Sequence, residues 1–343
     1  MDNKRNEILA PARPSFTKYM DLALAKMGGK VLYATDDFFA EKEKLILQSE
    51  AIFIKGKFTE QGQWMDGWES RRKRTPGHDW AIIQLATQTK IHGFNIDTSH
   101  FLGNQPAHGS IEAINLNQTT IPENWETANL DWTEILVKSK LDPGSHHYLS
   151  CSNTNAFTHL KLNIYPDGGV ARLRVYGEVE KDWSIHPADI QVDLASAVLG
   201  GNAIQCNDMF YSHMDNLIMP ERGINMGDGW ETKRNRTPNN RDWVVLRLAH
   251  VGSIKKVNID TAHFKGNFPD TCSLDACYSD SDDTVISNDV EWKPLLPKQK
   301  LSAHHEHIFT DEVNANTGIT HVRMNIFPDG GISRLRLYGH INH

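Results

Sequence analysis

A short run of acids, an aromatic ring and arginines occurs twice in this chain. The run Asp-Gly-Trp-Glu begins at residue 66 and again at residue 228, and arginines and a Thr-Pro pair follow both copies. Arginine binds carboxylates bidentately, and carboxylates accept hydrogen bonds from amide N–H groups. The run therefore predicts a cradle for a small polar anion. The alternative is a structural corner, with the tryptophans in the core and Arg–Glu pairs bracing the loop. The candidate residues are Asp66, Trp68, Glu69, Arg72 and Arg74, and in the second copy Asp228, Trp230, Glu231, Arg234 and Arg236.

A second repeated motif places an acid three residues before a histidine. Asp97 and His100 return as Asp260 and His263, each pair at the end of an expected strand. Because strand side chains alternate between faces, a turn after the strand is needed to bring the acid and the histidine together. Joined, they could act as an acid–base or metal pair; the alternative is a hydrogen-bonded histidine in a turn. A Gly-Asn pair follows each copy and adds the polar candidates Asn104 and Asn267.

Histidines also gather near the end of the chain. Residues 304–307 read His-His-Glu-His, and His305 and His307 would share one face of a strand, which suits two imidazole metal ligands. The first copy has only His146 and His147 in the related position, so the cluster is not duplicated. A polar strand or an oligomer contact is therefore favoured over a metal site, and the metal ligands of the chain stay unknown.

These motifs belong to one long internal repeat. The stretch from Ile91 to Pro106 returns 163 residues later. Short β-rich runs with alternating apolar and polar residues, and no long helices between them, predict an all-β antiparallel sandwich or jelly roll in each copy. A length of 343 residues fits two such domains, since a domain has about 150 residues.

The expected domain limits follow from where the repeat begins and ends. Before the first copy, Phe16, Met20, Leu24 and Met27 recur at helical spacing and predict a short packing helix. A charged stretch with Pro187 marks the seam between the copies. The expected units are an N-terminal extension with this helix (1–30), a first repeat (31–180) and a second repeat (191–343).

Composition excludes several classes of protein. A net charge of −7 argues against a general nucleic-acid binder, because phosphate neutralisation needs clustered positive charge. The four cysteines fall at non-equivalent places in the two copies, which predicts reduced structural thiols rather than disulfides or a structural zinc site. The first ten residues do not resemble a signal peptide, and no apolar run approaches the roughly 20 residues that span a membrane. We expect a soluble cytoplasmic protein without a membrane partner.

Taken in order, the motifs resemble those of the allantoicase family over about residues 30 to 340. The resemblance rests on the runs at 35–40 (Thr-Asp-Asp-Phe-Phe-Ala), 66–72, 77–80 (Gly-His-Asp-Trp), 95–104 and 166–169 (Pro-Asp-Gly-Gly). It implies a tandem pair of jelly-roll domains like galactose-binding domains. It also implies a homo-oligomeric hydrolase that cleaves allantoate to ureidoglycolate and urea in allantoin degradation, part of purine metabolism and nitrogen use.

The substrate suits the candidate residues. Allantoate carries one carboxylate, which Arg72 or Arg234 would hold, and two ureido arms for Asp, Glu and Asn side chains. One group must protonate the departing nitrogen and another must accept a proton from water. We expect His100 or His263 to share these roles with Glu69 or Glu231. No cofactor is certain, and a divalent metal could instead supply the hydroxide.

The two copies differ where a single site would be expected to match. Residues 77–79 (Gly-His-Asp) become 239–242 (Asn-Asn-Arg-Asp), one residue longer and without the histidine. Either one copy is catalytic and the other is scaffolding, or a composite site forms where domains or subunits meet. Two other functions stay open: a non-enzymatic jelly roll that binds sugars or small anions, and a hydrolase of another ureide or amide.

Overall fold

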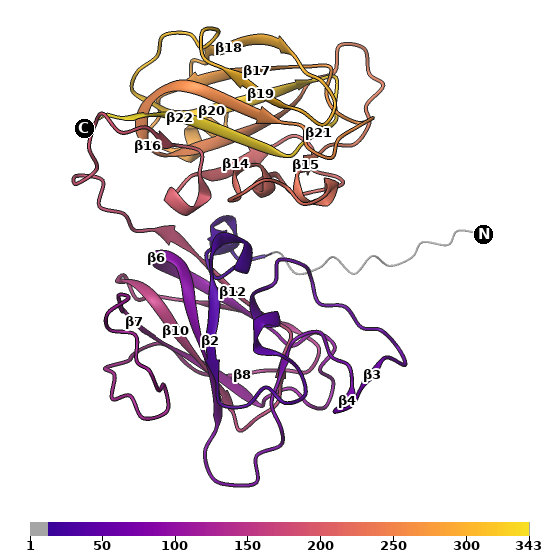
Figure 1. Ribbon diagram of the computed structural model, residues 1–343, viewed down its shortest axis with the longest axis vertical. Coiled ribbons are helices and arrows are strands. Elements are labelled where there is room, and N and C mark those ends of the chain that lie inside the picture. Colours follow the sequence, from indigo (N-terminus) through magenta and orange to yellow (C-terminus); the bar gives the residue numbers. More distant parts are fainter. Residues whose placement is uncertain (1–12, 343) are drawn as a thin grey trace. The chain divides into compact units, whose positions relative to one another are not determined.

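The computed structural model describes residues 13–342, which form two β-rich units, Met1–Glu178 and Val179–His343 (Figure 1). The first 12 residues of the expected N-terminal extension lie outside the described residues. In the part of the chain that is described, no helix is both long enough and apolar enough to cross a membrane. All four cysteines are free thiols, as predicted.

The first unit is built around one long strand, β6 (Asp79–Asp97). Residues 79–84 of β6 pair with β10 and β2, whereas residues 93–97 pair with β9. One strand thus contributes to both layers of a sandwich, and Ile83, Phe94 and Leu160 pack in the core between them. The other elements are η1 (Ser15–Lys18), β1 (Met20–Asp21), η2 (Ala25–Met27), β2 (Lys30–Ala34), η3 (Lys42–Ile46), β3 (Phe58–Thr59), β4 (Gly62–Gln63), β5 (Trp68–Glu69), β7 (His108–Ile114), β8 (Thr133–Lys140), β9 (His146–Ser150), β10 (Ala156–Tyr165), β11 (Gly169–Val170) and β12 (Arg172–Val179).

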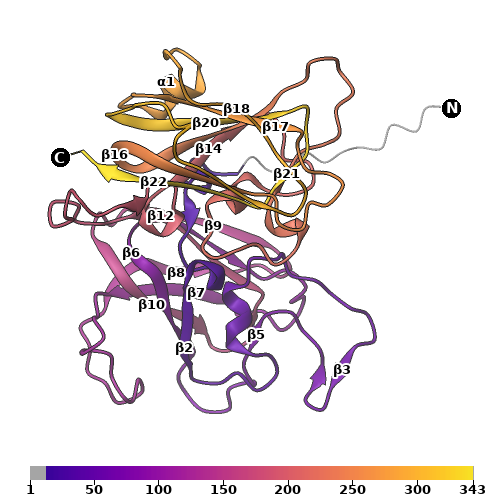
Figure 2. The same cartoon turned by 45° about the horizontal axis from the view of Figure 1, so that its top comes forward.

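The second unit repeats this plan around β16 (Asp242–Asp260). Residues 242–247 of β16 pair with β14 and β20, and residues 252–260 pair with β22. Figure 2 shows β18, β17 and β20 running side by side in one layer. The predicted antiparallel sandwich in each copy is confirmed. The remaining elements are β13 (Val192–Asp193), η4 (Ala197–Leu199), β14 (Asn202–Cys206), η5 (Met214–Ile218), η6 (Met226–Asp228), β15 (Trp230–Glu231), β17 (Thr271–Cys277), α1 (Asp282–Ile286), β18 (Lys293–Lys300), β19 (Glu306–Phe309), β20 (Ile319–Phe327), β21 (Gly331–Ile332) and β22 (Arg334–Ile341).

The helix expected from Phe16, Met20, Leu24 and Met27 is not one continuous helix. All four side chains are buried, but they lie in or beside the 3-10 turns η1 and η2 and the strand β1, which pairs with β12. The carboxylate of Asp21 accepts hydrogen bonds from the backbone N–H groups of residues 23 and 175, and this holds the segment against the sheet. Residues from Met20 onward therefore lie within the first sandwich.

Candidate functional site

Three repeated motifs converge at one end of each sandwich. In the first repeat, β5 pairs with β11, which places Glu69 opposite Gly169 of the Pro-Asp-Gly-Gly turn. The side-chain amide of Asn104 donates to Glu69 Oε1 at 2.7 Å, and Asn104 O accepts from the N–H of Gly169 at 2.7 Å. The structure thus brings together a predicted catalytic acid and a predicted substrate ligand. In the second repeat, the Asn267 amide donates to Glu231 in the same way.

Burial changes the acidity of Glu69. Its side chain is only 9% exposed, and this burial raises the pKa of the carboxyl group above its usual 4.5, although the hydrogen bond from Asn104 opposes the shift. A carboxylic acid that keeps its proton to higher pH is suited to protonating a leaving group.

Replacing Glu69 with glutamine should stabilise the protein at neutral pH. Because the folded-state pKa is raised, the stability contributed by this carboxyl is complete below pH 4.5 and is lost as pH rises through the folded pKa. Glutamine stays neutral and can still accept from Asn104. The variant should therefore unfold at a higher temperature than the parent at neutral pH, with the difference shrinking below pH 4.5. Thermal unfolding at several pH values measures this, and a pH-independent difference would contradict it.

The repeated tryptophans and their neighbouring aspartates are structural. Trp68 and Trp230 are both 0% exposed, and their indole N–H groups donate to the backbone carbonyls of residues 36 and 208. Neither ring can therefore be a platform for a ligand, which agrees with the core alternative.

Asp66 and Asp228 are held by buried arginines that the sequence motifs did not single out. Arg172 Nη2 lies 2.9 Å from Asp66 Oδ2, and Arg334 Nη2 lies 3.1 Å from Asp228 Oδ2. The repeated Arg-Leu-Arg after the Pro-Asp-Gly-Gly turn was the signal that could have identified these two partners.

The arginines of the second copy face an open cavity of about 600 Å³. Among the described residues, neither Arg234 nor Arg236 has an ion-pair or hydrogen-bond partner, and both are exposed. Asp242, only 2% exposed, also lines the cavity, and its Oδ2 is buried without a hydrogen-bond partner. Free guanidinium groups beside an unsatisfied acceptor suit a ligand that carries both a carboxylate and N–H donors. The lining residues are Asn207, Asp208, Lys233, Arg234, Asn235, Arg236 and Asp242.

The same place is filled differently in the first repeat. Lys73 corresponds to Asn235, and its Nζ lies 2.7 Å from Oδ1 of Asp79, the counterpart of Asp242. The first copy thus neutralises its acid with an internal lysine, whereas the second copy offers the acid to a ligand. Arg72 and Arg74 are exposed in this first copy, as their counterparts are in the second.

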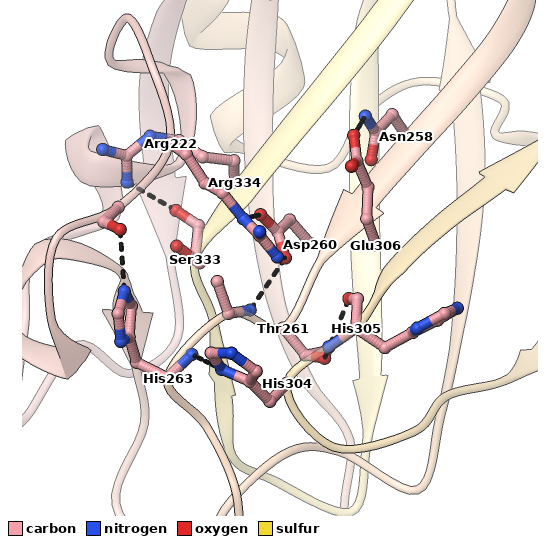
Figure 3. A network of polar contacts seen from close by, with 12 residues as sticks. Arg222, Asn258, Asp260, Thr261, His263, His304, His305, Glu306, Ser333 and Arg334 are labelled. Carbon is pink, nitrogen blue, oxygen red and sulfur yellow. Dashed lines mark hydrogen bonds and ion pairs between the residues drawn. The ribbon is translucent and has the colours of Figure 1, made fainter.

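The predicted Asp–His pairs are not joined by hydrogen bonds in either repeat, so far as the described residues go. His100 Nε2 donates to the carbonyl of Ala51 at 3.0 Å, and His263 Nε2 donates to the carbonyl of Gly223 at 2.8 Å. Each histidine has φ of 70°, so the chain turns sharply there and sends the ring to a neighbouring loop. Asp97 instead accepts from the N–H of Ser99. The turn alternative therefore describes both histidines, as Figure 3 shows for His263.

The histidine run at 304–307 does not form a metal site. Both ring nitrogens of His307 bond to backbone atoms, with Nδ1 donating to Ile259 O and Nε2 accepting from Ser302 N. His304 Nδ1 accepts from the N–H of His263. These contacts hold β19 and its preceding turn in place, which leaves the rings unable to converge on one ion.

Each domain is thus a jelly roll whose repeated polar loops gather at one end, a class in which loops carry the function. A family model described as the allantoicase repeat matches residues 20–180 and 192–342. The chain belongs to the allantoicase family.

Relatives match this chain over nearly its whole length. The "Probable allantoicase" of Pseudomonas fluorescens (strain Pf0-1) is 49% identical over 328 residues, covering 95% of this chain and 97% of that protein. The "Probable allantoicase 1" of Burkholderia mallei is 46% identical, covering 96% and 97%. The crystal structure of allantoicase from Saccharomyces cerevisiae superposes with a TM-score of 0.78 at 35% identity, covering 94% of this chain and 93% of that one.

Proposed function

We propose that this protein is an allantoicase that hydrolyses allantoate to ureidoglycolate and urea in purine degradation. The observation that carries this proposal is the 49% identity with a probable allantoicase over 95% of the chain, including both repeats. The non-enzymatic sugar-binding alternative has no comparable support.

We further propose that the cavity of the second repeat binds the substrate. Arg234 and Arg236 would hold the carboxylate of allantoate, and Asp242 Oδ2 would accept hydrogen bonds from a ureido arm. This assignment is supported by the absence of other partners for these groups among the described residues. It extends the sequence-based candidates by one acid, Asp242, and does not use the buried tryptophans.

The chemistry needs two proton transfers. Water adds to the central carbon as urea leaves, so one group accepts a proton from water and another protonates the departing nitrogen. The acid–base candidates stay Glu69, Glu231, His100 and His263. The raised pKa of Glu69 supports a carboxylic acid as the proton donor. The histidines bind backbone carbonyls through Nε2, so only Nδ1 of each ring is left for catalysis.

Urea release tests the reaction. The purified protein should release urea from allantoate but not from allantoin or ureidoglycolate. Without turnover, with or without added divalent metal, the enzymatic proposal would be wrong. A screen for sugar and small-anion binding would then test the alternative.

We also propose a cytoplasmic homo-oligomer that binds neither nucleic acid nor membranes. Support for self-association comes from exposed apolar side chains of Ile52, Phe53, Ile54 and Phe58, which are 41–67% exposed in one segment of the first repeat. Apolar side chains clustered on a surface are typical of protein contacts. Light scattering and cell fractionation measure assembly and location.

A further inference from the structure

The two repeats place opposite charges at one equivalent position. Arg172 Nε donates to the carbonyl of Ser49, and its counterpart Arg334 Nε donates to the carbonyl of Glu221. The residues that follow these carbonyls, Glu50 and Arg222, therefore occupy the same place in the two sandwiches.

In the second repeat, this position supplies an internal cation. Arg222 binds Asp260 with both ends of its guanidinium group, Nε to Oδ2 at 2.7 Å and Nη2 to Oδ1 at 3.1 Å (Figure 3). Glu306 of the neighbouring strand β19 stands opposite Asp260 in register and also acts electrostatically on Arg222. Two acids are thus neutralised in part by one built-in positive charge.

In the first repeat, the cation has been replaced by a third ligand-type side chain. Asp97 corresponds to Asp260, and His146 stands opposite it in register as Glu306 does in the second repeat. Glu50, Asp97 and His146 each offer a ligand atom, and these atoms all lie within 4.8 Å of one another. Two carboxylates so close, with no basic side chain of the Arg222 kind between them, repel each other.

The buried member of this group has an unused acceptor. Asp97 is 1% exposed, and its Oδ2 has no hydrogen-bond partner, while Oδ1 accepts only from the N–H of Ser99. A buried carboxylate oxygen without a partner is costly unless a cation or donor satisfies it. The second repeat satisfies its equivalent oxygen with Arg222.

We propose that the first repeat binds a divalent transition-metal cation through Glu50, Asp97 and His146. Two carboxylate oxygens and one imidazole nitrogen suit Mn²⁺ or Zn²⁺ and leave coordination positions for water or a ligand. Asn95 contacts His146 Nδ1 at 3.0 Å, and Tyr148 stacks on the ring with centroids 6.0 Å apart, so the imidazole is oriented by its neighbours. The cation takes the structural place of Arg222, and this inference does not depend on the proposed reaction.

Metal titration of the full chain tests the site. After chelator treatment and dialysis, calorimetry with Mn²⁺ and separately with Zn²⁺ should show one equivalent bound per chain, with a rise in the unfolding temperature of the protein. Glu50→Gln should weaken binding at least about tenfold, as loss of a charged ligand does.

Two further variants make the result specific to this site. Glu50→Arg copies the arrangement of the second repeat, so it should abolish binding while keeping the unfolding temperature of the metal-free protein at or above that of the parent. Glu306→Gln changes the equivalent cluster of the second repeat and should leave binding unchanged. If Glu50→Arg still binds one equivalent, or if the parent binds none, the proposed site is wrong.

Discussion

Replacing Arg172 with methionine should lower the free energy of unfolding by about 3–5 kcal/mol, the usual cost of removing one partner from a buried ion pair. Arg172 is 1% exposed, and it binds the Asp66 carboxylate together with the backbone carbonyls of Ser49, Asp66 and Ala171. Methionine fills much of the volume but leaves these acceptors without donors. The loop that carries the Asp-Gly-Trp-Glu run would lose its attachment to β12.

Denaturant unfolding measures this effect. Arg72→Met is the matched control, because Arg72 is exposed and its replacement should change the free energy of unfolding by less than about 0.5 kcal/mol. A loss below about 1 kcal/mol in Arg172→Met would contradict the structural role of this arginine.

Replacing Arg234 with alanine should lower kcat/KM for allantoate by about 100-fold, since a hydrogen bond to a charged group contributes up to about 3 kcal/mol. Arg234 is exposed at the rim of the second-repeat cavity and has no partner within the described chain, so the fold should be unaffected. The expected cause is weaker binding of the substrate carboxylate.

Arg72→Ala makes the equivalent change in the first repeat. Because Lys73 neutralises Asp79 there, this variant should keep kcat/KM within about threefold of the parent. A large loss in Arg72→Ala with none in Arg234→Ala would move the substrate site to the first repeat. If neither variant loses activity, the arginine loops do not bind the substrate.

The sandwich in each copy could be predicted because alternation along strands such as β10 and β20 survives in the sequence. The strands β1 and β13 were missed for a physical reason. Each has only two residues, too few to show a period, and Asp21 and Asp193 are 172 residues apart rather than the 162 or 163 that relates the other motifs. The extra length lies in the loops between η3 and β5, which are longer in the first repeat.

This change of spacing also hid part of the candidate site. Glu50 and Arg222 lie within those loops of unequal length, so their equivalence is visible only through the backbone carbonyls that Arg172 and Arg334 contact. The sequence identified the Asp-Gly-Trp-Glu run but could not say which members face solvent, because an irregular loop has no periodicity. Trp68 turned inward while Arg72 stayed exposed, and only packing decides between these outcomes.

The long strands β6 and β16 have a consequence for how each domain opens. Because the two halves of β16 hydrogen-bond to different layers, the layers cannot separate without breaking pairings along one continuous piece of backbone. Each sandwich should therefore open as a single cooperative unit. The backbone amides of Val244 to Leu246 and Val257 to Ile259 should exchange with deuterium at similarly slow rates, although they belong to opposite layers.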